Sequence, residues 1–253
     1  MTQPRAWGYL RSHPALQSAA AKAPFCSSST PSPPQPIIEL REYNVNPGDM
    51  AAYLKATTAA FDLRRKLSPV RFFCFPETGC DLFISTHAYY YQGGHAERDA
   101  ARAAMSNDAE WKEYLSTILP HLNKVKSTIF VQAPLVSEID EIHGLEELAS
   151  IPKENDDNNC ILEFRRYNLQ LGYDTVPRFL EYYGQGLPSK LAAPGTDPTT
   201  SLVTVLYSDV GRLNEVFEIW RHGNGTAAME QSRVAARGAQ EWRTAIANIA
   251  DLA

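Results

Sequence analysis

A nine-residue segment that occurs twice constrains the fold of this chain more than any other feature. Residues 37–45 read IIELREYNV, and residues 161–169 read ILEFRRYNL. Both segments carry Glu-x-Arg-x-Tyr-Asn within an apolar frame, so we interpret the chain as a tandem repeat of one structural unit. Side chains alternate between the two faces of a strand, so the Glu, Arg and Tyr of each copy are predicted to share one face.

The sequence after the first copy predicts a β-α-β-β-α-β unit, because helical and strand periodicities of apolar residues follow one another. The predicted elements after the first strand are a helix from Pro47, strands at 70–75 and 82–89 around a turn at 76–79, helices at 96–105 and from Asn107, and a strand at 128–133. This is the ferredoxin-like order of elements. Each such sheet has helices on one face only, so the two units are predicted to pack together through their sheets as a pseudo-dimer.

The second unit repeats this order but lacks its last strand. Its predicted elements are a helix over 176–187, strands at 202–207 and 213–220, and helices at 225–236 and 240–249. The fourth strand of a ferredoxin-like sheet lies beside the first, so its absence predicts an exposed edge along residues 160–169. A partner could add a strand to this edge, or a longer natural C-terminus could cover it.

Composition divides the chain into four segments. They are a leader (1–36), a first module (37–136), a linker (137–159) and a second module (160–253). The leader contains Arg5, Arg11 and Lys22 and no acid, which is typical of a mitochondrial transit peptide, although a tail without targeting function remains open. The linker carries eight acidic residues and one Lys, so we expect most of it to be solvated, either as a spacer or as a partner-binding segment.

Several classes of function are disfavoured by composition. The pI is about 5.7 and no basic patch alternates with aromatic residues, so nucleic acid is not an expected partner. No apolar run reaches the roughly 20 residues of a transmembrane helix. The histidines and cysteines have no metal-site spacing, and no dinucleotide or phosphate-loop motif is present, so we expect no metal and no cofactor.

The two units together resemble the NIPSNAP family. The matching residues are Glu39-Leu40-Arg41-Glu42-Tyr43, Val216-Phe217-Glu218-Ile219-Trp220, and the helical pieces Arg98, Arg102, Glu110-Trp111, Arg233 and Glu241-Trp242. His87-Ala88-Tyr89 stands in the first unit where family members often have His-Ile-Trp, and Glu218 replaces that His in the second. The resemblance covers residues 37–250.

The resemblance implies an α+β fold with two dimeric α/β-barrel modules. It also implies a mitochondrial protein, in the matrix, that binds mitochondrial proteins and functions in mitochondrial quality control. It leaves homo-oligomerisation open and transfers no catalytic residue. Relatives that share the fold include small monooxygenases, but a fold does not determine a function.

Polar and aromatic residues of the strands are the candidates for a ligand pocket. They are Glu39, Arg41, Tyr43, His87, Tyr89, Glu163, Arg165, Tyr167 and Trp220. We expect their face to lie between the two sheets, where Arg41 could bind a carboxylate or phosphate, or else pair with Glu39 and fix the packing. His87 could act as an acid or base, or form one satisfied hydrogen bond in the core. Trp111 and Trp242 are predicted to be packing anchors.

Two hypotheses of function follow. The first is a non-enzymatic mitochondrial protein that works by binding other proteins. The alternative is a cofactor-free monooxygenase or isomerase that acts on a small hydrophobic molecule in a barrel pocket. An open cavity beside the candidate residues would favour the alternative, and a filled core there would favour the first.

Overall fold

The computed structural model describes residues 33–142, 144–146, 148 and 159–253. Residues 1–32 of the predicted leader and much of the predicted linker therefore lie outside the described residues. Residues 34–253 form one compact unit. Its first half contains β1 (Ile37–Val45), a 3-10 turn η1 (Pro47–Asp49), α1 (Met50–Ala59), α2 (Phe61–Leu67), β2 (Val70–Cys74), β3 (Ile84–Tyr91), α3 (Gly94–Asn107), α4 (Ala109–Ile118), η2 (Leu119–His121), β4 (Leu122–Gln132) and α5 (Leu135–Glu138).

The second half repeats this order without a fourth strand among its described residues. It contains β5 (Ile161–Asn168), α6 (Thr175–Leu191), β6 (Thr200–Val210), β7 (Glu215–His222), α7 (Gly225–Gly238) and α8 (Gln240–Ala250). Two boundaries differ from prediction. Strand β4 begins at Leu122, six residues before the predicted start. The prediction missed its first half because that part is exposed and carries no apolar alternation. Helix α4 begins after Asp108, whose carboxylate accepts a hydrogen bond from the Trp111 amide at 2.8 Å and so caps the helix.

The strands form a seven-stranded antiparallel sheet in the order β2-β3-β1-β4-β6-β7-β5. Pairing of β4 with β6 joins the two halves, with Val131 opposite Tyr207. Strand β5 ends the order and, among the described strands, pairs only with β7. The predicted α+β fold is therefore confirmed, and β5 lies at the end of the sheet as predicted.

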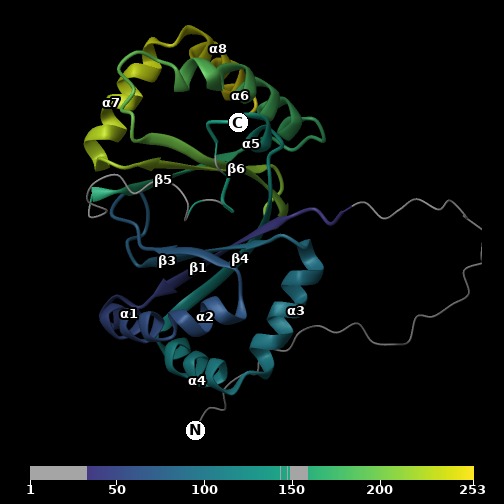
Figure 1. Cartoon of the computed structure of the whole chain (residues 1–253), viewed down its shortest axis with the longest axis vertical. Coiled ribbons are helices and arrows are strands. Elements are labelled where there is room, and N and C mark those ends of the chain that lie inside the picture. The colour runs from purple at the N-terminus through teal and green to yellow at the C-terminus, as the bar shows by residue number, and fades with distance from the viewer. Residues whose placement is uncertain (1–32, 143, 147, 149–158) are drawn as a thin grey trace, which may run out of the picture. The chain divides into compact units, whose positions relative to one another are not determined.

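The two halves of the sheet face each other, and helices cover their outer sides (Figure 1). Apolar side chains of β1 and β3 pack between the halves against β6 and β7, in a cluster of buried residues that includes Ile38, Leu40, Val203, Leu206 and Phe217. The Phe72 and Phe164 rings, on the two edge strands β2 and β5, lie 5.8 Å apart. The predicted pseudo-dimer packing is thus present.

The expected orientation of the polar face was wrong. Tyr43 packs with Tyr53, Met105 and Trp111 of the first-half helices, and Glu39 bonds to Arg98 of α3. The Glu, Arg and Tyr of each repeat thus face the helices, whereas the intervening apolar residues face the other half. Both faces of the strand are buried, so alternation shows which residues share a face but not which layer covers it.

The described part of the acidic segment also departs from expectation. Leu145 is fully buried in the cluster between the two halves, and Ile142 is buried in the second-half core. Gln132 of β4 accepts a hydrogen bond from the Leu145 amide at 3.3 Å. Burial removes both apolar side chains from water, which favours an ordered path for this part of the segment.

Candidate ligand site in the second module

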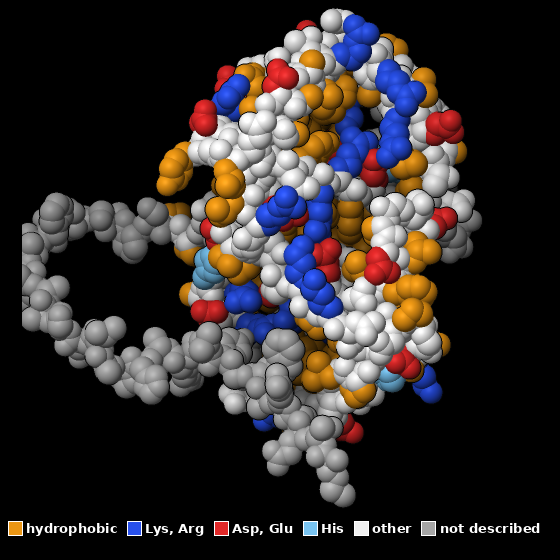
Figure 2. Space-filling view, turned by 180° about the vertical axis from the view of Figure 1, so that it is seen from behind, with side chains coloured by type: hydrophobic (Ala, Val, Ile, Leu, Met, Phe, Trp, Pro, Cys, Tyr) orange, Lys and Arg blue, Asp and Glu red, His pale blue; other side chains and the backbone are white. Residues whose placement is uncertain are grey.

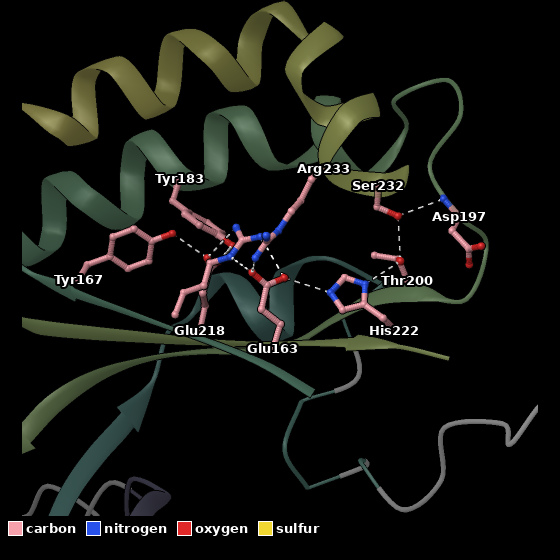
Figure 3. A network of polar contacts seen from close by, with 10 residues as sticks. Glu163, Tyr167, Tyr183, Asp197, Thr200, Glu218, His222, Ser232 and Arg233 are labelled. Atoms are coloured by element: carbon pink, nitrogen blue, oxygen red, sulfur yellow. Dashed lines mark hydrogen bonds and ion pairs between the residues drawn. The ribbon is translucent and has the colours of Figure 1, made fainter. Parts of the chain in front are cut away.

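Two buried carboxylates organise the helix-facing side of the second half (Figure 3). Glu163 of β5 accepts hydrogen bonds from Arg165 at 2.6 Å and from Arg233 of α7, and its Oε2 lies 3.1 Å from His222 Nε2. Glu218 of β7 accepts bonds from Arg165 at 3.2 Å, from Tyr167 at 2.7 Å and from Tyr183 of α6. Arg165 therefore bridges both carboxylates.

These contacts determine the charge states of the cluster. Burial by itself would raise the pKa of Glu163, but the bonds from His222, Arg165 and Arg233 outweigh it and hold that pKa below its usual range. Burial and the neighbouring Glu218 carboxylate raise the pKa of the Tyr183 and Tyr167 hydroxyls. The cluster thus contains an ionised Glu163, a charged Arg165 and neutral phenols that donate hydrogen bonds.

A cavity of about 410 Å³ lies beside this cluster. Its walls come from α6, β5, β6, β7, α7 and α8 and from the loop before β6; they are Arg165, Lys190, Leu191, Thr196, Thr200, Trp220, His222, Ser232, Arg233, Ala236, Arg237, Trp242, Arg243 and Ile246. Figure 2 shows the second half hollowed on this side, with hydrophobic side chains inside and basic side chains around them. No carboxylate is among the lining residues.

Three buried polar atoms of the cavity wall have no hydrogen-bond partner among the described residues. They are Lys190 Nζ, Thr196 Oγ1 and Trp220 Nε1. An indole N–H and an ammonium can only donate, and a hydroxyl can also donate. Buried donors are usually satisfied, so three unsatisfied donors around one cavity indicate room for an acceptor atom of a ligand.

Lys190 lies between two aromatic rings at the inner wall. Its side chain is 9% exposed, and Nζ is 3.5 Å from the Trp220 ring centroid and 4.4 Å from that of Trp242. Burial lowers the pKa of Lys190 to about 7, against an opposing effect of the Glu218 carboxylate. The ring faces stabilise the ammonium but leave its hydrogen atoms without acceptors.

The first half shows what a filled version of this site looks like. The offset that relates Trp111 to Trp242 also relates β3 to β7 and α3 to α7. Arg64 of α2 places its guanidinium 4.9 Å from the Trp111 ring centroid and donates hydrogen bonds to the hydroxyls of Tyr89 and Tyr114. A buried cation therefore lies on the corresponding tryptophan in both halves. Arg64 has two phenol acceptors, although its Nε is unpaired, whereas Lys190 Nζ has no acceptor among the described residues.

Three replacements between the halves account for the difference. Trp220 and Ala245 occupy the positions that correspond to Tyr89 and Tyr114, so both phenol oxygens are absent. Ala236 occupies the position of the buried Met105, and this shorter side chain lines the cavity. These replacements remove the acceptors and leave space.

A glycine allows the helices above the cavity to pack closely. A Cβ added at Gly186 of α6 would stand 2.5 Å from the Ala245 Cβ of α8, which is too close for two carbon atoms. Helix α6 therefore packs directly against α8, and this contact occupies the space that a tyrosine at position 245 would need. The cavity opens beside this contact, toward Ala236.

The structure separates the predicted candidate residues into two clusters. Glu163, Arg165, Tyr167 and Trp220 meet in the second half, where Arg165 and Trp220 line the cavity. Glu39, Arg41, Tyr43, His87 and Tyr89 meet in the first half, in the packed core beneath its helices. The predicted packing anchors Trp111 and Trp242 are both buried, and Trp242 also lines the cavity.

His87 is embedded in this first-half core. Its Nε2 lies 2.9 Å from Ser85 Oγ and 3.2 Å from the Tyr53 hydroxyl, and its Nδ1 lies 3.4 Å from the Tyr89 hydroxyl. Burial, together with the positive charges of Arg64 and Arg41, keeps the pKa of His87 well below its usual value. The imidazole is therefore neutral, and its contacts are those of a core residue.

Lys190 and Thr196 were not predicted from the sequence as candidates. Lys190 follows Pro188 near the end of α6, where a lysine usually reaches solvent and interacts with the helix C-terminus. The sequence signal for this cavity was the replacement of Tyr89 by Trp220 and of Met105 by Ala236 at equivalent positions of the two repeats. These replacements indicate a cavity only once the structure shows that both positions lie between the helices and the sheet.

Residues 38–136 match the model of the NIPSNAP family. Residues 38–136 of this chain belong to the NIPSNAP family. It is 24% identical over 209 residues to the human protein NipSnap homolog 3B, covering 81% of this chain and 76% of that protein. This NIPSNAP protein is therefore a distant homologue of the human protein.

Two solved structures extend over both halves. One is a Fusobacterium nucleatum protein provisionally assigned as a monooxygenase, with a TM-score of 0.55, 12% identity and coverage of 87% of this chain and 88% of its own. The other, with the same provisional assignment, is from Lactobacillus acidophilus, with a TM-score of 0.52, 9% identity and coverage of 86% and 89%. At these identities the likeness describes the fold of the NIPSNAP protein and not its chemistry.

The described residues contain neither a metal-binding cluster nor a membrane-spanning helix. No group of three or more His, Cys, Asp or Glu side chains there is arranged to hold a metal ion. In the same part of the chain, none of the helices combines the length and apolarity needed to cross a bilayer.

Proposed function

We propose that this NIPSNAP protein binds a small molecule with an apolar body in the cavity of its second module. The observation that carries the proposal is the contrast between the halves, since one site is closed by Arg64 and Met105 while the other is open and carries unpaired donors. A cavity of about 410 Å³ lies within the range of small-molecule sites. We therefore favour binding of a small molecule over binding of other proteins, which was the first hypothesis from the sequence.

The proposal predicts that Ala236→Met closes the site. Methionine is the first-half residue at this position, so its side chain should occupy the cavity as Met105 occupies the first-half core. We expect binding of the fluorescent probe 1-anilinonaphthalene-8-sulfonate to weaken about tenfold or more, which corresponds to about 1.4 kcal/mol. Fluorescence titration of the full chain measures this.

The matched control is Ala247→Met, on the exposed face of the same helical layer. It adds the same side chain away from the cavity and should leave the titration unchanged. Equal probe affinity in wild type and Ala236→Met, with unchanged melting temperatures, would contradict a ligand site in this cavity.

The cavity does not by itself indicate catalysis. The two carboxylates near it, Glu163 and Glu218, are engaged by arginines, His222 and tyrosines, so neither is free to act as a general base. We therefore propose binding as the primary role. Oxygenation or isomerisation of the bound molecule, without a cofactor, is the enzymatic extension of the same site.

Protein binding in mitochondria is the second candidate function. The observation that favours it is the outer edge of β5, which has no strand partner among the described residues. Residues 1–36, which lie almost wholly outside the described residues, would direct import, and the quality-control role follows the family resemblance. Affinity purification of the tagged chain from isolated mitochondria tests this, since recovery only from the cytosol, or without bound protein, would contradict it.

A further inference from the structure

We propose that the cavity takes the carboxylate of an apolar acid, held by Lys190 together with the N–H of Trp220 and the hydroxyl of Thr196. This inference rests on the proposed function, because it names the class of ligand for the same cavity. It is carried by the three unpaired donors and by the charges of the wall.

The first step concerns Lys190 itself. A buried ammonium is usually paired with an anion, and the described residues place no carboxylate within ion-pair distance of Nζ. The two nearby carboxylates, Glu163 and Glu218, are engaged by Arg165, which lies on the same side of the sheet. The described residues therefore supply no counterion for Lys190.

The second step concerns the other donors and the entrance. Trp220 Nε1 and Thr196 Oγ1 add two neutral donors to the ammonium, a set that matches the two oxygens of a carboxylate. The wall also carries Arg233, Arg237 and Arg243 and no acid, so its potential attracts an anion. The remaining surface is largely aromatic and aliphatic, from Leu191, Trp242 and Ile246, and it suits an alkyl or aryl body.

The third step concerns pH. Charged and titratable groups surround Lys190 on four elements: Glu163 and Arg165 on β5, Glu218 and His222 on β7, Arg233 and Arg237 on α7, and Arg243 on α8. In the free protein the pKa of Lys190 is about 7, and a bound carboxylate would raise it. Between about pH 6 and 7 both the ammonium and the carboxylate are charged, so affinity should be nearly constant. Above about pH 7, binding requires uptake of a proton, so affinity should fall about tenfold per pH unit.

The test uses the full chain with decanoate, and with 1-decanol as a neutral molecule of equal chain length. Isothermal titration calorimetry should show decanoate bound about ten- to a hundredfold more tightly than decanol near neutral pH, as for a charge-assisted hydrogen bond. Lys190→Met should remove this preference. Lys190→Arg should keep it and abolish the loss of affinity above pH 7, since arginine stays charged.

Arginine is a suitable replacement because Arg64 already lies on Trp111 in the first half. Circular dichroism of each variant confirms folding, and Lys190→Arg provides the test if Lys190→Met does not fold. Equal binding of decanoate and decanol, or a pH dependence that persists in Lys190→Arg, would overturn the carboxylate proposal. Absence of decanoate binding would overturn it as well. Loss of probe binding in Ala236→Met would still support the cavity, so the two proposals can fail separately.

Discussion

Replacing Glu218 with alanine is expected to lower the free energy of unfolding by about 3–5 kcal/mol. Glu218 is fully buried and accepts hydrogen bonds from Arg165, Tyr167 and Tyr183. The truncation would leave two buried phenols without acceptors and remove one of the two carboxylates that compensate Arg165. A chain of this size should lose roughly 2–4 °C of melting temperature per kcal/mol, so differential scanning calorimetry measures the effect readily.

A conservative variant and a control make this prediction specific. Glu218→Gln keeps the shape and one acceptor oxygen but removes the charge, so its effect should be about half as large. Glu230→Ala removes an exposed carboxylate of α7 and should change stability by less than about 0.5 kcal/mol. If Glu218→Ala unfolds at the same temperature as Glu230→Ala, the buried network does not contribute as described.

The fold could be predicted because it depends on patterns that one sequence contains. The two nine-residue copies indicated the repeat, and apolar alternation together with helical spacing indicated the order of the elements. The absent fourth strand also followed from this order, and β5 ends the sheet as expected. The packing of the two sheets against each other could be predicted because each sheet has helices on one face only, and its other apolar face must also be buried.

The site could be predicted only in part. Arg165 and Trp220 were among the candidates and line the cavity, but their face was assigned to the wrong layer. The reason is physical: Glu39 and Glu163 are compensated by Arg98 and Arg233, which come from helices distant in sequence. The sequence of a strand can indicate that its glutamate is buried, but it does not show which layer of the structure supplies the arginine that pairs with it. Cavities are also invisible in one sequence, since Ala236 creates space only relative to its neighbours.

The second large effect expected is a loss of stability in acid. Burial would raise the pKa of Glu39, but Arg41 and the bonds from Arg98 and Ser127 hold it below its usual value, and the pKa of Glu163 is lowered in the same way. A carboxyl whose folded pKa is depressed contributes stability above its unfolded pKa. That contribution is lost as pH falls from the unfolded value toward the folded one.

We therefore expect the free energy of unfolding to begin to fall near pH 6.5, because His87 takes up a proton there in the unfolded chain but not in the folded chain. The fall should become steeper below about pH 4.5. Each of the two carboxyls adds a slope of about 1.4 kcal/mol per pH unit in that window, because the unfolded chain binds a proton that the folded chain does not. Urea unfolding followed by circular dichroism at successive pH values measures the slope.

Glu39→Gln and Glu163→Gln separate these two carboxyls from general acid unfolding. Each variant removes one titrating group, so each should be less stable than wild type at neutral pH and should lose less stability on acidification. Their effects should add, because Glu39 and Glu163 belong to separate networks in the two halves. Glu110→Gln, at an exposed position of α4, should keep the wild-type slope. A wild-type slope in the Glu39→Gln, Glu163→Gln double variant would show that other carboxyls control the acid transition.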